Sequence, residues 1–158
     1  MREHTVLRIV SQFVIAPILL YAFYVQFHGE YSPGGGFQAG VILATAIILY
    51  GLIFGVEAAR VAVPPTLLRI GASLGLLIYG GTGVATILLG GNFLDYDRLA
   101  AHGGQYYGLI VIELGVGITV ASVMIAIFYV FAGRGRQNNP DEDEDHGQAD
   151  DYDADDIT

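Results

Sequence analysis

The chain is built from long apolar stretches separated by short polar breaks. Four stretches are long enough to cross the hydrocarbon of a bilayer, which takes about 20 apolar residues in a helix. They lie at about residues 6–27, 37–56, 70–92 and 107–132. None alternates with the period of two that a membrane barrel shows, and lipid offers the backbone no hydrogen-bond partners. The pattern predicts an all-α integral membrane protein, with a bundle of four transmembrane helices within residues 1–136.

Composition supports this class and shows that the charge is unevenly distributed. Of the 158 residues, 53% are hydrophobic and 15% charged, with a formal net charge of −9. Ten of the sixteen acidic residues lie within residues 141–156. A segment so polar and acidic buries too little surface to fold alone, so residues 137–158 are expected to form a disordered, solubilising tail. A docking or regulatory tail is the alternative.

The residue types that are missing exclude several functions. There is no lysine, which excludes a strongly basic nucleic-acid-binding face. There is no cysteine, which excludes disulfide scaffolds, cysteine zinc sites, iron–sulfur clusters and thiol nucleophiles. No predicted span contains the core histidines that a bis-histidine haem needs, because all four histidines lie outside the spans or at their ends. We therefore expect no haem and no cysteine-bound metal site.

The arginines predict the orientation. With four spans, both termini share one side with the loop between the second and third helices. That side holds six arginines, whereas the opposite loops hold only Arg98. The positive-inside rule places the arginine-rich side in the cytoplasm. The chain is thus expected to be a multi-pass protein of the cytoplasmic membrane with cytoplasmic N- and C-termini. The six arginines are Arg2, Arg8, Arg60, Arg69, Arg134 and Arg136.

Glu113 is the one acidic residue well inside a predicted span. If the fourth helix begins near Tyr107, the rise of ~1.5 Å per residue places Glu113 ~9 Å below the outer edge. An ionised carboxylate there costs about 2.5 kcal/mol or more, so Glu113 should be neutral, paired or beside a wet cavity. It is the leading candidate for handling protons or cations. The alternative is a structural role, in which a protonated Glu113 hydrogen-bonds a neighbouring helix.

Glycines occur in pairs four residues apart, at Gly51 with Gly55, Gly71 with Gly75, and Gly104 with Gly108. In membranes, helices associate through close packing of small residues on one face. We therefore interpret these pairs as helix-packing faces.

A glycine-rich loop between the first two spans is the most unusual local sequence. It contains a G-x-G-x-x-A pattern, but the dinucleotide-binding fingerprint must follow a strand, and here a transmembrane segment precedes it. Pro33 cannot extend a helix, while the glycines permit positive φ and a close approach of backbone to another element. The segment is expected to be a tight turn or a short non-helical stretch at membrane depth. The candidate structural-loop residues are Pro33, Gly34, Gly35, Gly36, Phe37 and Gln38.

This loop resembles the signature of the MnhB or MrpB subunit of Mrp-type multisubunit Na⁺/H⁺ antiporters. The glycine run at 80–83 and Glu113 with its following glycines are also similar to that family, and the likeness covers about residues 6–132. Three positions depart from the family pattern. Gly29-Glu30 stands where the family usually has Gly-His, Ala39 where it often has glycine, and Glu113 where it usually has aspartate.

The resemblance implies an accessory membrane subunit of a cation/proton antiporter that is driven by the proton gradient, needs no cofactor or metal, and is not an enzyme. Its partners would be the other subunits of the complex and the lipid bilayer. The chain has no intramembrane lysine and no evident inverted repeat, features expected of a self-contained transporter. Glu113 is expected to line part of an ion or proton path. Two alternatives remain: a structural subunit of a related redox-driven complex of the energy-converting hydrogenase type, and a scaffold without ion contact.

Overall fold

The computed structural model describes residues 2–28, 34–96 and 104–137, and the regular structure in these ranges is helical. The five helices are α1 (Arg2–His28), α2 (Gly36–Phe54), α3 (Val56–Ala62), α4 (Pro65–Leu88) and α5 (Gly104–Gln137). Four of them are long and apolar enough to cross a membrane, namely Val6–His28, Gly36–Phe54, Pro65–Leu88 and Gly104–Gly133. The predicted four-span helical bundle is confirmed. The acidic segment 138–158, on which the tail prediction falls, lies outside the described residues.

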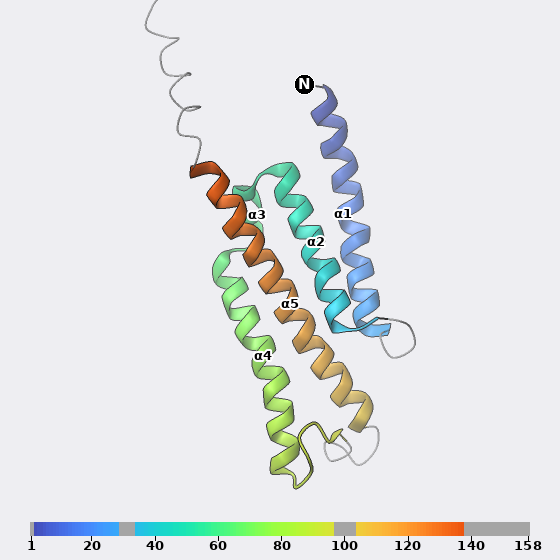
Figure 1. The fold of residues 1–158 in the computed structure, drawn as a ribbon. Helices are drawn as coiled ribbons and strands as arrows, with labels where there is room; N and C mark the ends of the chain where they lie inside the picture. Colours follow the sequence, from blue (N-terminus) through green and yellow to red (C-terminus); the bar gives the residue numbers. More distant parts are fainter. Residues whose placement is uncertain (1, 29–33, 97–103, 138–158) are drawn as a thin grey trace, which may run out of the picture.

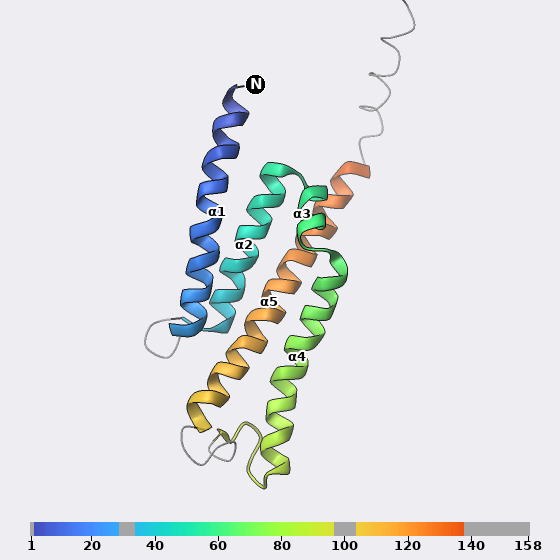
Figure 2. The same cartoon turned by 180° about the vertical axis from the view of Figure 1, so that it is seen from behind.

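The long helices stand side by side in the order α1, α2, α5, α4 (Figure 1). The extensive interfaces are α1 with α2, α2 with α5, and α5 with α4. Figure 2 shows the same order from behind, with α3 linking α2 to α4 beside the C-terminal half of α5. The start of α1 and the end of α5 lie at the same end of the bundle as α3, which we call the termini end. The opposite end, where α1 finishes and α2 begins, is the glycine-loop end.

The third span differs from its predicted position at about residues 70–92. The helix α4 begins at Pro65, which suits the first helical position because a helix needs no N–H there. It ends at Leu88, and Gly90 follows with a φ of +79°, which glycine adopts without strain. The prediction used the uncharged interval and therefore started the span after Arg69. In the structure Arg69 lies inside the helix, exposed near its start, where its long side chain can extend toward the membrane surface.

At the termini end, Tyr129 of α5 holds the short helix α3 in place. Its side chain is 4% exposed, and its hydroxyl lies 2.8 Å from the Ala59 carbonyl oxygen and 3.1 Å from that of Val63. Arg60 donates from Nη2 to the Tyr129 carbonyl oxygen at 3.2 Å and lies over the tyrosine ring. Buried apolar residues pack around this point, including Ala44 of α2. This cluster joins α2, α3, α4 and α5 at one end of the bundle.

The glycine pairs do not all act alike. On α4, a Cβ atom on Gly71 or Gly75 would collide with Ser122 or Thr119 of α5, so this pair is a packing face, as predicted. Gly51 likewise lies against Phe128. Gly55 is different, because no atom of the described residues lies within 4 Å of where its Cβ would be and its φ is +98°. Gly55 therefore provides the turn between α2 and α3, and the predicted packing contact does not form within the described part of this chain.

Candidate ion-path site at the glycine-loop end

The structure brings the glycine loop and Glu113 together. Gly34 and Gly35 are non-helical, and the Gly35 carbonyl oxygen accepts the Ala39 N–H at 3.0 Å, which starts α2. A Cβ atom on Gly35 would lie 3.3 Å from Glu113 Oε1, and Gly35 has a φ of +150°, which side-chain-bearing residues rarely adopt. The carboxylate of Glu113 therefore lies against the backbone that leads into α2.

Gly36 makes the closest approach. It is buried, and a Cβ atom added to it would overlap the backbone carbonyl oxygen of Glu113. Because this neighbour is backbone and not a flexible side-chain end, only glycine fits here without moving one helix. The glycines at 35 and 36 thus allow the first turn of α2 to cross α5 directly at Glu113. Since α5 begins at Gly104, Glu113 lies about 13 Å along the helix.

The other loop candidates lie apart from this contact. Phe37 is 63% exposed and Gln38 is also exposed, so both side chains of the first turn of α2 remain at the surface. Pro33 lies outside the described residues. Of the predicted loop residues, Gly35 and Gly36 are therefore the two that the structure places against Glu113.

Gln26 and Gly117 complete this junction, and no pattern in the sequence places either of them beside the glycine loop. Gln26, near the end of α1, is 7% exposed. A Cβ atom on Gly117, one turn after Glu113, would lie 2.6 Å from Gln26 Oε1 and 3.1 Å from the Gly36 carbonyl oxygen. The available signal for Gln26 was a polar residue in the second, otherwise apolar half of the first span. Its partners come from α2 and α5, which the local sequence does not reveal.

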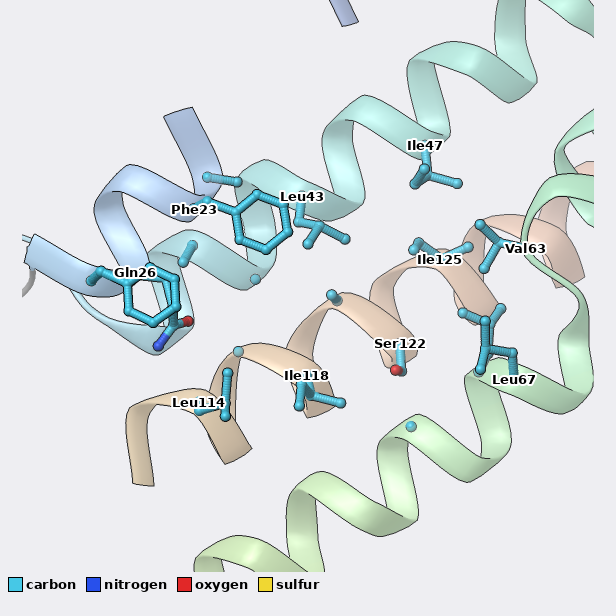
Figure 3. A pocket seen from close by; sticks show the side chains of 18 residues that line it. Phe23, Gln26, Leu43, Ile47, Val63, Leu67, Leu114, Ile118, Ser122 and Ile125 are labelled. Carbon is cyan, nitrogen blue, oxygen red and sulfur yellow. The ribbon is translucent and has the colours of Figure 1, made fainter. Parts of the chain in front are cut away.

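A cleft of about 350 Å³ opens beside the junction (Figure 3). It is lined almost wholly by apolar side chains from α1, α2, α4 and α5 and by Val63 after α3. Figure 3 shows Gln26 and Leu114 toward one end, Val63 and Leu67 at the other, and Ser122 between them. Gln26 and Ser122 are the polar side chains among the residues that line it.

The chemistry available at this site is that of one carboxylate and one amide. The described part of the chain contains no group of three or more histidine, cysteine, aspartate or glutamate residues able to hold a metal ion. His28, at the end of α1, stacks on Tyr24 with ring centroids 4.3 Å apart. A carboxylate in a spanning helix can take up and release a proton where water reaches it.

These features define a multi-pass helical membrane protein with one acidic side chain at a helix crossing. Residues 6–126 match the family of domains related to the MnhB subunit of Na⁺/H⁺ antiporter. The chain belongs to this family.

Staphylococcal relatives match most of the chain. A protein of Staphylococcus haemolyticus (strain JCSC1435) named "Putative antiporter subunit mnhB2" is 32% identical over 133 residues, 80% of this chain and 94% of the relative. A protein of the same name from Staphylococcus aureus (strain Newman) is 34% identical over 133 residues, which again cover 80% of this chain and 94% of the relative. The resemblance of the glycine loop to the MnhB family is confirmed.

Proposed function

We propose that this chain is an accessory membrane subunit of a multisubunit monovalent cation/proton antiporter of the Na⁺/H⁺ type, driven by the proton gradient. Membership of the MnhB family supports a subunit of such an antiporter, and the relatives' names favour it over the hydrogenase-type complex. The observation that carries the ion-path role is the placement of the Glu113 carboxylate against Gly35, inside a spanning segment. We expect this chain to have no enzymatic activity.

Large apolar surfaces on the helices favour an assembled subunit. Only 11% of the residues in the most apolar stretch of α1 are buried within this chain, and 17% of those in the corresponding stretch of α4. Large side chains such as Phe13 and Leu77 are 77% and 69% exposed. Lipid covers part of this surface, and helices of other subunits can pack on the rest through van der Waals contact. We therefore assign transport to the complex and a contributory role to this chain.

Reconstitution tests this division of labour. Vesicles that hold the purified chain alone should show no exchange of Na⁺ for protons when a proton gradient is applied. Vesicles that hold the complex isolated through an affinity tag on this chain should exchange the two ions. A matched complex assembled without this chain should have lost most of the exchange. Exchange by the chain alone would contradict the accessory role.

We also propose that the termini end faces the cytoplasm. The arginines at that end, including Arg8 and Arg60, support this orientation through the positive-inside rule. Because the chain has no cysteine, single cysteines can report the side directly. In right-side-out vesicles, a membrane-impermeant thiol reagent should label Gln38→Cys at the glycine-loop end and leave Glu57→Cys unlabelled. Labelling of Glu57→Cys alone would reverse the orientation.

A further inference from the structure

Gln26 is a buried amide whose donor has no hydrogen-bond partner among the described residues. Its exposed fraction is 7%, and its Nε2 atom makes no hydrogen bond to any described residue. Leaving a buried amide donor without a hydrogen bond destabilises the folded state. Other polar side chains in the spans avoid this cost by bonding to their own helix: Ser11 to Leu7 at 2.8 Å and Thr119 to Gly115 at 2.9 Å. Gln26 differs from these two residues, because its donor is buried and makes no hydrogen bond among the described residues.

The packing around Gln26 places this amide against Gly117, one turn of α5 beyond Glu113. Gly117 follows Glu113 by one turn of α5, so the two positions lie on neighbouring parts of one helix face. The Gln26 carboxamide and the Gly36 carbonyl oxygen both lie close to Gly117, while Gly36 itself meets the backbone of Glu113. Any side chain at 36 or 117 would separate these groups. The two glycines therefore bring an amide of α1 within about one helical turn of the acid of α5.

We propose that Gln26 is a positioning residue of the ion path, and that its Nε2 donates a hydrogen bond to a water molecule through which protons reach Glu113. A buried water makes about three hydrogen bonds. In this proposal the water is held by the Gln26 amide, the Gly36 carbonyl oxygen and the Glu113 carboxylate, which gather around Gly35, Gly36 and Gly117. The water gives one proton to the ionised carboxylate and receives one from the next water along the path, so no proton is gained or lost. This inference rests on the proposed function of Glu113.

Substitution of Gln26 in the assembled antiporter complex tests the inference. Gln26→Leu keeps an apolar body of similar length and removes the donor. The maximal rate of exchange per assembled complex should fall about tenfold, the factor that one hydrogen bond of ordinary strength supplies. The KM for Na⁺ should stay unchanged, because the amide serves the proton step. Gln26→Asn retains an amide donor and should recover part of the rate.

Gln12→Leu is the matched control, since Gln12 is an exposed amide on the same helix. It should leave both the rate and the KM unchanged. A native gel of the complex separates loss of assembly from loss of rate, because the rate is expressed per assembled complex. A Gln26→Leu complex with the same rate as the Gln12→Leu complex would overturn the inference.

The same assay separates this inference from the proposed function on which it rests. If Glu113→Gln stops exchange while Gln26→Leu behaves like its control, only the role of Gln26 is wrong. If Glu113→Gln exchanges at the full rate, both fail. If both single variants are slow and the double variant is no slower than Glu113→Gln alone, the two residues act on one path, as proposed.

Discussion

Replacing Glu113 with glutamine is expected to lower proton-driven Na⁺ exchange by the assembled complex about a hundredfold, the lower range for removal of a group that transfers a proton. Glutamine keeps the shape of the side chain against Gly35, so the helix crossing should survive. It cannot release or take up a proton. The measurement is the rate of Na⁺-dependent pH change in vesicles, expressed per assembled complex.

The control for this variant is Glu57→Gln, the same chemical change at the termini end. The Glu57 side chain is 67% exposed, and its oxygen lies 3.6 Å from Arg60. An exposed ion pair of this kind contributes about 0–1 kcal/mol, so its loss should leave assembly and exchange intact. Glu113→Asp retains the acid with a shorter reach, and we expect it to keep most of the activity. An unchanged rate in Glu113→Gln would reduce Glu113 to a structural role.

Replacing Gly36 with alanine should have the largest effect on packing. The added methyl group would overlap the carbonyl oxygen of Glu113, so the first turn of α2 must move away from α5. Overpacking of this kind typically costs about 1–3 kcal/mol. The complex should therefore denature at a lower temperature in detergent. Exchange should also fall, because the backbone beside the Glu113 carboxylate is displaced.

Gly80→Ala is the matched control for Gly36→Ala. Gly80 also lies in a spanning helix, but none of the atoms that the structure describes lies within 4 Å of where its Cβ would be. Alanine favours a helix over glycine by about 1 kcal/mol, so this variant should be as stable as the unsubstituted chain or more so. Equal denaturation temperatures for the Gly36→Ala and Gly80→Ala complexes would show that the contact between α2 and α5 tolerates a side chain.

The sequence alone predicted the class of protein and the number of spans, for a general physical reason. A spanning segment must satisfy its backbone hydrogen bonds internally and must be apolar along its length, so each span appears as a continuous local pattern. The family likeness was also local, because it rests on the short glycine segment before Gln38 and on the residues that follow Glu113. Boundaries were less predictable. The start of α4 at Pro65 and the short helix α3 depend on turn residues and on contacts with Tyr129.

The tertiary structure alone showed which of these features belong together. Glu113 and the glycine loop each stood out in the sequence, but nothing local places Gly36 on the backbone of Glu113. The contact follows from the order α1, α2, α5, α4, in which α5 packs between α2 and α4 although α3 and α4 separate α2 from α5 in the sequence. Gln26 gained its candidate role in the same way. Helix packing in membranes depends on close surface fit between distant segments, and periodicity within one segment carries no information about its partner.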